Sequence, residues 1–262
     1  RYDTISHIHK NINLPKPFAT SGRDQDAVKL ISYDTDTEAK IAASILFEHN
    51  IAGNSFQEYL QTCKNIPLII EPIIKAYFQG RGKFDALPIS TELGNLLFEV
   101  TVDYGAYRDI KRHRRNLFLA APFTAEIGFE YPEYVATEQD LFEVKQKIER
   151  CAEVTLQLHR KVKEKYPHLA QYVVMFANKQ QMLWQMDPRQ LAYVVELRTT
   201  PAGHHSYRTI CQEMFRLAAR KLPILSKYIR VDMSSGDQGR KKQEEKTVEK
   251  LQELGANLER TS

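Results

Sequence analysis

An apolar, strand-like segment that runs directly into a dense cluster of cations most constrains this chain. Residues 96–102 are almost wholly apolar, and residues 108–115 then carry five Lys or Arg against one Asp, a local charge of +4. The 262-residue chain has 37 Lys+Arg and 33 Asp+Glu, also +4, so the rest is formally neutral. Excess positive charge attached to a core strand favours an anion-binding site over a solvated tail.

The spacing within the cluster predicts a helix that presents three guanidinium groups on one face. Arg108, Arg112 and Arg115 recur at i, i+4 and i+7, positions that lie on the same side of a helix. Such groups repel one another unless they are solvated, paired with acids or facing an anion. A solvated basic face is therefore the alternative. Arginine suits the planar, two-pronged binding of phosphate or carboxylate better than lysine does.

Composition and hydropathy narrow the class of protein. The chain is 42% hydrophobic, enough for a sizeable core, but no apolar run reaches the roughly 20 residues that span a bilayer, so we expect no membrane partner. Cys63, Cys151 and Cys211 are widely spaced and odd in number, which indicates a reducing, cytoplasmic location without disulfides. The chain begins with Arg1 and not Met, which indicates processing or a longer parent protein.

A metal site is not expected from this sequence. His204 and His205 are adjacent, so their side chains point in different directions on a strand or a helix. Neither a cysteine nor a carboxylate pattern nearby completes a tetrahedral ligand set. A nucleic-acid partner is also disfavoured, because only one patch is basic and no stacking motif interleaves with it.

The order of the segments predicts an α+β fold with a central mixed or antiparallel sheet flanked by helices. Turn residues indicate an extended N-terminal arm at 1–27, and a shift to polar composition indicates a mobile charged tail at 231–262 with a short helix at 243–254. Residues 28–230 would form one domain. The predicted strands are 28–33, 96–102, 172–176 and 181–186. The predicted helices are 35–50, 55 to about 67, 108–115, 137–165, 188–197 and 206–222.

Three of these helices carry N-terminal signals. Thr35-Asp36-Thr37-Glu38 and Ser55-Phe56-Gln57-Glu58 each have the spacing of a capping box, in which two side chains satisfy free backbone groups. Thr137, three residues before Asp140, is the expected cap of the longest helix. That helix carries an apolar stripe from Leu141 to Val162 for the core or for a partner.

An ordered set of motifs resembles the flavin-dependent thymidylate synthase family over roughly residues 28–225. Arg112-His113-Arg114 follows the apolar strand, and Asp187-x-Arg189 precedes Glu196-Leu197-Arg198. The resemblance implies an α+β fold and a homotetramer, with FAD and dUMP sites between subunits. It also implies the reductive methylation of dUMP, or of a related pyrimidine nucleotide, with NADPH and methylenetetrahydrofolate as co-substrates.

Individual roles follow from the same resemblance. The residues matching the family's cofactor-binding positions are Glu92, Arg112, His113, Arg114, Asp187 and Arg189. Those matching its substrate-binding positions are Asp109, Arg112, Gln171 and Arg198. Arg198 matches the catalytic arginine that polarises the pyrimidine, because a guanidinium beside a ring carbonyl stabilises the anion that makes C5 nucleophilic.

The sequence departs from the family pattern mainly on the nucleotide side. The family continues after Arg-His-Arg with a serine and then Asn-Glu-x-Ser-x-Arg-Tyr, whereas residues 115–124 read Arg-Asn-Leu-Phe-Leu-Ala-Ala-Pro-Phe-Thr. Asp109 replaces a glutamine, Gln171 an arginine and Asp187 an asparagine. Two functions therefore stay open: a divergent flavin-dependent enzyme, or a non-catalytic scaffold domain that completes the sites of a partner domain, as in tandem forms.

Overall fold

The computed structural model describes residues 26–82, 84–234, 247, 248 and 250. The predicted arm at 1–27 and tail at 231–262 fall mostly outside these residues, so the division at 28 and 230 stays a prediction. Across the described part, one cluster of buried apolar side chains extends from Val28 to Ile229. No helix in this part is both long and apolar enough to cross a membrane.

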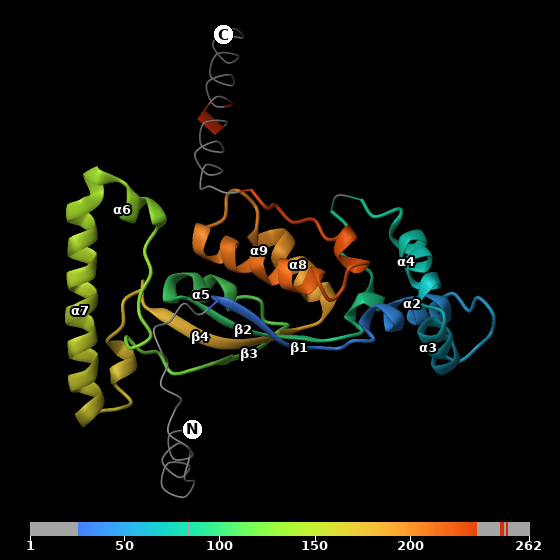
Figure 1. Cartoon of the computed structure of the whole chain (residues 1–262), viewed down its shortest axis with the longest axis horizontal. Helices are drawn as coiled ribbons and strands as arrows, with labels where there is room; N and C mark the ends of the chain where they lie inside the picture. The colour runs from blue at the N-terminus through green and yellow to red at the C-terminus, as the bar shows by residue number, and fades with distance from the viewer. Residues whose placement is uncertain (1–25, 83, 235–246, 249, 251–262) are drawn as a thin grey trace, which may run out of the picture.

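A four-stranded antiparallel sheet forms the centre of the described structure (Figure 1). Its strands are β1 (Val28–Tyr33), β2 (Leu96–Asp103), β3 (Leu117–Ala120) and β4 (Lys179–Met186), in the order β1-β2-β4-β3. Side chains along β2 and β4 alternate between buried and partly exposed, as the two-residue period of a strand requires. Phe98 on β2 lies opposite Trp184 on β4, and both are fully buried. The expected α+β fold is confirmed.

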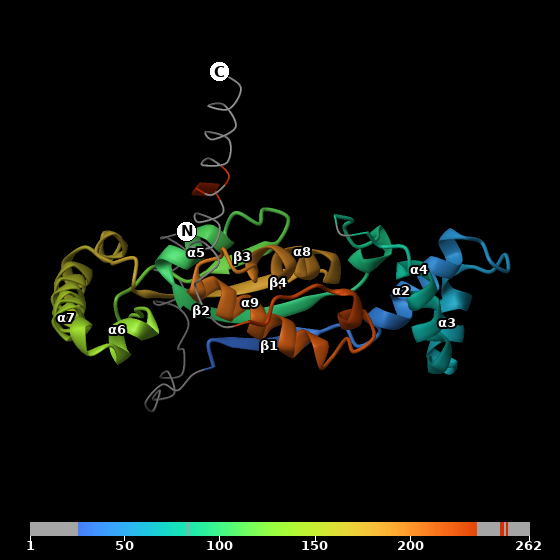
Figure 2. The ribbon, with the colours of Figure 1, turned by 90° about the horizontal axis from the view of Figure 1, so that it is seen from above.

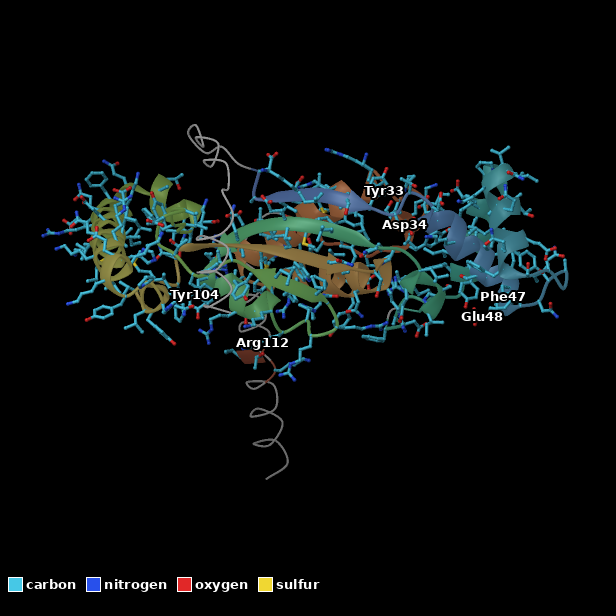
Figure 3. The ribbon with its side chains drawn as sticks, turned by 90° about the horizontal axis from the view of Figure 1, so that it is seen from below. Tyr33, Asp34, Phe47, Glu48, Tyr104 and Arg112 are labelled. Atoms are coloured by element: carbon cyan, nitrogen blue, oxygen red, sulfur yellow. The ribbon has the colours of Figure 1, made fainter. Side chains whose placement is uncertain are left out.

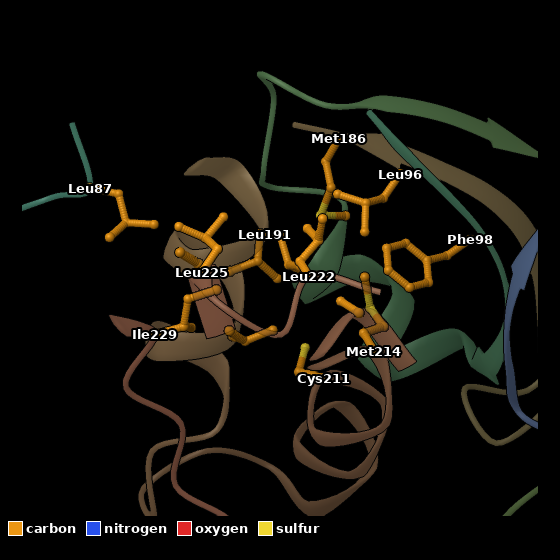
Figure 4. Packing of buried hydrophobic residues seen from close by; sticks show 14 of the residues in the cluster. Leu87, Leu96, Phe98, Met186, Leu191, Cys211, Met214, Leu222, Leu225 and Ile229 are labelled. Atoms are coloured by element: carbon orange, nitrogen blue, oxygen red, sulfur yellow. The ribbon is translucent and has the colours of Figure 1, made fainter. Parts of the chain in front are cut away.

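Three helices cover one face of the sheet (Figures 1 and 2). They are α5 (Tyr104–Ile110), α8 (Pro188–Arg198) and α9 (His205–Ala219). Figure 4 shows Leu191 of α8 and Cys211 and Met214 of α9 packed near Phe98 of β2 and Met186 of β4. This packing fixes α8, which carries Arg198, against the sheet.

Two further groups of helices lie at opposite ends of the sheet (Figure 1). One group is α2 (Thr37–Glu48), α3 (Phe56–Asn65) and α4 (Ile70–Phe78). The other is α6 (Glu133–Thr137) and α7 (Phe142–Lys165). Short 3-10 helices occur at Pro67–Ile69, Ile89–Glu92, Gln139–Leu141, Ala170–Tyr172 and Leu225–Tyr228. The apolar stripe of α7 is not fully buried in the core, since Val144 and Leu158 are 43% and 48% exposed.

The predicted basic helix at 108–115 is wrong. Helix α5 ends at Ile110, and residues 111–116 form turns in which His113 N donates to Ile110 O and Asn116 N donates to His113 O. The chain must reverse here because residues 117–120 pair with β4 as the sheet's edge strand. Arg108, Arg112 and Arg115 therefore do not share one helix face.

Two other element predictions also fail, each for a local reason. No strand forms at 172–176, since a 3-10 helix ends at Tyr172 and Met175 N donates to the Asn178 side chain. Thr137 does not cap the long helix, because it is the last residue of α6 and α7 begins only at Phe142 without a side-chain cap.

Candidate functional site

The turns at 111–116 and the exposed side of α8 enclose a hollow of about 380 Å³, here named the arginine pocket. Its lining residues are Arg112, His113, Arg114, Arg115, Gln190, Tyr193, Leu197 and Arg198. The fold thus brings the Arg-His-Arg motif beside Arg198, a residue more than 80 positions later in the chain. Arg112 lies at the open side, with 74% of its side chain exposed and its Nε 3.7 Å from Asp109 Oδ1 (Figure 3).

The best-defined contact of the pocket joins His113 to Arg198. Arg198 Nε donates to His113 Nε2 at 2.9 Å, and Arg198 Nη2 donates to the backbone oxygen of Asp109 at 2.9 Å. The Arg198 guanidinium also lies over the Tyr207 ring, with its carbon 5.3 Å from the ring centre. The guanidinium is therefore held from three sides before any ligand arrives.

His113 is buried, with 6% of its surface exposed. Its ring lies 6.2 Å from the Trp184 ring and 5.7 Å from the Tyr193 ring, measured between centres. Burial, and then the charge of Arg198, lower the pKa of His113 from 6.5 to about 4. The imidazole is consequently neutral at physiological pH, as an acceptor from arginine must be.

A carboxylate shared by two arginines adjoins the pocket. Glu92 accepts from Arg189 Nη1 at 2.6 Å and forms an ion pair with Arg115 through its other oxygen. These two arginines lower the pKa of Glu92 to about 2. Arg189 Nε also donates to the backbone oxygen of Leu87, so this arginine anchors the loop that carries Glu92.

Asp187 is the N-cap of α8. Its Oδ1 accepts from Gln190 N at 2.8 Å, and burial raises its pKa above the ordinary value.

Among the predicted cofactor residues, the structure places Arg112, His113 and Arg114 in the pocket. Glu92, Asp187 and Arg189 do not line the pocket: Glu92 pairs with Arg189 and with the pocket residue Arg115, and Asp187 caps α8.

The predicted substrate residues are divided among three hollows. Arg112 and Arg198 line the arginine pocket. Asp109 contacts Arg112 through its carboxylate and Arg198 through its backbone oxygen, but it lines a separate hollow of about 370 Å³. Gln171 instead lines a cavity of about 1020 Å³, whose walls include residues 118–124 and the α7 side chains His159 and Lys163. Gln171 Nε2 donates there to the backbone of His168 at 3.1 Å.

Arg115 was expected on the basic face, but three pocket residues were not among the sequence candidates: Gln190, Tyr193 and Leu197. Gln190, Tyr193 and Leu197 stand at i, i+3 and i+7 of α8, and Tyr193 and Leu197 are 56% and 45% exposed. Large side chains at that spacing, on the side of α8 away from the core, are a sequence signal that could have indicated these pocket residues.

The arrangement suits an anionic ligand that carries a planar ring. Four guanidinium groups line the hollow, and none of its described lining residues carries a carboxylate. Tyr193 adds an exposed aromatic surface.

No group of three or more His, Cys, Asp or Glu side chains suited to a metal ion is present in the described part of the chain.

Comparison with known proteins gives one family and several relatives. The family model described as thymidylate synthase complementing protein, Thy1, matches residues 29–224. A UPF0159 protein of Chlamydia muridarum is 30% identical over 226 residues, covering 84% of this chain and 41% of that protein. A UPF0159 protein of Thermoplasma acidophilum is also 30% identical over 226 residues, covering 84% and 44%. The chain thus spans less than half the length of these relatives.

A solved structure shares the fold at low identity. The UMP/dUMP methylase PolB of Streptomyces cacaoi, bound with 5-Br dUMP, superposes with a TM-score of 0.59 at 16% identity. The match covers 79% of this chain and 95% of that one. Similarity at this level establishes the architecture of the sheet and its helices and nothing about the ligand.

Proposed function

Since the chain belongs to the thymidylate synthase complementing protein (Thy1) family, we propose that it is a thymidylate synthase-like protein whose arginine pocket binds FAD beside a pyrimidine nucleotide. The observation that carries this proposal is the convergence of Arg112, Arg114, Arg115 and Arg198 on one hollow without a carboxylate in its lining. The diphosphate of FAD requires several fixed cationic donors, and these residues fit that requirement. Bound FAD would supply hydride chemistry.

Each side chain has a distinct part in this proposal. Arg112 and Arg114 hold phosphate groups at the open side of the pocket. Arg198, held in place before binding, presents a guanidinium to the pyrimidine and stabilises negative charge on its ring. The substrate in this proposal is dUMP or a related pyrimidine nucleotide, with NADPH and methylenetetrahydrofolate as co-substrates of the active form.

Two observations favour the second candidate, a non-catalytic scaffold that completes the sites of a partner domain. Residues 117–120, where the family has part of its nucleotide-binding signature, form β3 and commit their backbone to pairing with β4. Gln171 lies in the other cavity and not in the arginine pocket. A nucleotide phosphate would therefore rely on a second chain or domain for part of its binding.

The proposed assembly is a homo-oligomer such as a tetramer, or a tandem pair with a second domain, located in the cytoplasm. The exposed apolar side chains Val144, Val154 and Leu158 share one face of α7 and are a surface that such a partner would cover. Light scattering on the purified chain tests this directly. A mass near 30.4 kDa, that of a single chain, contradicts a stable homo-oligomer.

Flavin binding is tested by calorimetry with added FAD and by the absorbance of the purified protein. We expect Arg112→Ala and Arg114→Ala each to weaken FAD binding about tenfold or more, because each removes a charge-assisted hydrogen bond. Arg108→Ala is the matched control, since it removes the same charge from the same cluster but outside the pocket. Absence of FAD binding by the wild type, or equal losses in all three variants, contradicts the proposal.

Turnover separates the enzyme from the scaffold. The assay follows tritium release from 5-tritiated dUMP in the presence of FAD, NADPH and methylenetetrahydrofolate. We expect little release by this chain alone, because part of the expected nucleotide site, including Gln171, lies outside the arginine pocket. Robust release that Arg198→Ala abolishes would establish the enzyme and exclude the scaffold.

A further inference from the structure

The contact between His113 and Arg198 indicates a role for the one histidine among the described lining residues of the arginine pocket. We propose that His113 is a positioning residue, a neutral hydrogen-bond acceptor that sets the direction of the Arg198 guanidinium in the arginine pocket. The inference rests on the proposed function only for its consequence, the binding of an anion. The hydrogen-bonding arrangement itself is independent of any ligand.

The two hydrogen bonds of Arg198 use one edge of its guanidinium. Nε donates to His113 Nε2 and Nη2 donates to Asp109 O, both at 2.9 Å. These two nitrogens share the side-on edge of the planar group, so two fixed acceptors determine its plane and its rotation. Within the described residues, these two hydrogen bonds leave Nη1 and the second hydrogen of Nη2 for a ligand. The Tyr207 ring, 5.3 Å from the guanidinium carbon, supports one face.

His113 meets the requirements for this role in both protonation and packing. Arginine is always a donor, so His113 Nε2 must lack a proton and the ring hydrogen must be on Nδ1. The ring is fixed by contact with Trp184 and Tyr193 and by turns on either side of residue 113. Burial keeps it neutral. No other side chain accepts from Arg198 in the described structure.

Two replacements of His113 distinguish a hydrogen-bond acceptor from a side chain that only fills space. Leucine at position 113 would fill much of the volume, but it would leave Arg198 Nε without an acceptor, and the guanidinium would turn toward water. Glutamine brings an amide oxygen to about the place of Nε2 and restores the acceptor. Recovery by glutamine but not by leucine is therefore specific to a positioning role.

The decisive measurement is nuclear magnetic resonance on the whole ¹⁵N-labelled chain without ligand. We expect a slowly exchanging Nε–Hε resonance of Arg198, assigned by its loss in Arg198→Lys, and a His113 ring protonated on Nδ1. His113→Gln should keep the Arg198 resonance, and His113→Leu should speed its exchange about tenfold or more, the equivalent of one lost hydrogen bond. Backbone spectra establish that each variant is folded.

Titration with inorganic pyrophosphate gives the functional consequence. Without a nucleotide base, this small anion is free to contact all four arginines of the pocket, Arg198 included. We therefore expect the dissociation constant to rise about tenfold in His113→Leu and to stay within about threefold in His113→Gln. Two results overturn the proposal even if His113→Leu does not fold. One is a wild-type His113 ring that is protonated on Nε2. The other is fast exchange of the Arg198 Nε–Hε hydrogen in a folded His113→Gln protein. If wild-type protein binds no pyrophosphate while the Arg198 resonance behaves as expected, the proposed function fails and the positioning role stands.

Discussion

Arg81 and Glu196 form a two-pronged ion pair that ties the segment after α4 to α8. Arg81 Nη1 and Nη2 donate to the two carboxylate oxygens of Glu196 at 2.9 and 2.8 Å, and Nη1 also reaches the backbone oxygen of Tyr228 at 2.6 Å. Only 8% of the Arg81 side chain is exposed. Glu196 lies two residues before Arg198, so this pair holds the end of the helix that carries the pocket arginine.

We expect Arg81→Ala to lower the free energy of unfolding by about 3 kcal/mol, because it removes the cationic partner of the Glu196 carboxylate and leaves it with the backbone N–H of Arg230. Lys29→Ala is the control, since Lys29 and Glu99 are 4.0 Å apart and both more than a third exposed. It should cost less than about 0.5 kcal/mol. Urea denaturation followed by circular dichroism measures both, and equal effects would contradict the assigned importance of the buried pair.

Two segments with the same capping-box spacing, at the starts of α2 and α3, form different hydrogen bonds. The Ser55 box forms, with Glu58 N donating to Ser55 Oγ and Ser55 N donating to Glu58 Oε2. The Thr35 box does not: Asp36 is the N-cap of α2, and Glu38 Oε1 accepts from the backbone N of Ile224 and Leu225 at 2.7 and 2.8 Å.

We therefore expect Ser55→Ala to destabilise the protein by about 1 kcal/mol and Thr35→Ala to have almost no effect. Glu38→Ala should cost about 1–3 kcal/mol, because it leaves two backbone N–H groups of a distant segment without an acceptor. Chemical denaturation of the three variants gives the comparison. A Thr35→Ala effect as large as that of Ser55→Ala would show that the first box forms after all.

The Glu38 contact illustrates what the sequence could and could not predict. Local patterns were sufficient for β1, β2, β4, α8 and α9. Alternation coincides with burial in β2 and β4, and helical spacing does so in α8 and α9. A partner 186 residues away is absent from any local pattern, and here it overrode a capping box. The same limit hid β3, because residues 117–120 become a strand only by pairing with β4.

The arginine pocket was predictable in its charge but not in its geometry. The Arg-His-Arg motif and Arg198 came from the sequence, and the fold brings them together. The expected helix face of Arg108, Arg112 and Arg115 was wrong, since Arg108 lies on α5 whereas turns present Arg112 and Arg115. Periodicity carries no information about a turn whose shape is set by the strand that follows it.

Glu92 restrains the pocket by holding Arg115, and this gives a prediction with a definite sign. We expect Glu92→Gln to strengthen pyrophosphate binding about threefold to tenfold, because Arg115 loses its competing carboxylate. Stability should fall by about 1 kcal/mol, since Arg115 and Arg189 both lose an ion pair. Calorimetric titration at low salt is the measurement.

Glu99→Gln, which removes the same charge from β2 outside the pocket, is the matched control and should leave the affinity unchanged. Weaker pyrophosphate binding by Glu92→Gln would instead mean that Glu92 supports the ligand directly or through the loop that it anchors. The low Glu92 pKa of about 2 ensures that the carboxylate is charged throughout the assay.

The neutral state of His113 links the pocket to stability at acid pH. The charged group in contact with its ring is Arg198, and the hydroxyl-bearing rings are Tyr193 and, beyond Arg198, Tyr207. Its pKa falls from 6.5 in the unfolded chain to about 4 in the folded protein. Between these values the unfolded chain binds more protons, so stability decreases as the pH falls.

The contribution of His113 should be complete above about pH 6.5, decline through the interval and stop changing below about pH 4. At about 1.4 kcal/mol per unit, the loss is roughly 3 kcal/mol. His113→Gln does not titrate, so the difference in unfolding free energy between wild type and this variant isolates the effect from other groups. Urea denaturation at several pH values between 4 and 7.5 provides that difference. Parallel curves for the two proteins would mean that His113 titrates normally in the folded state and is open to water.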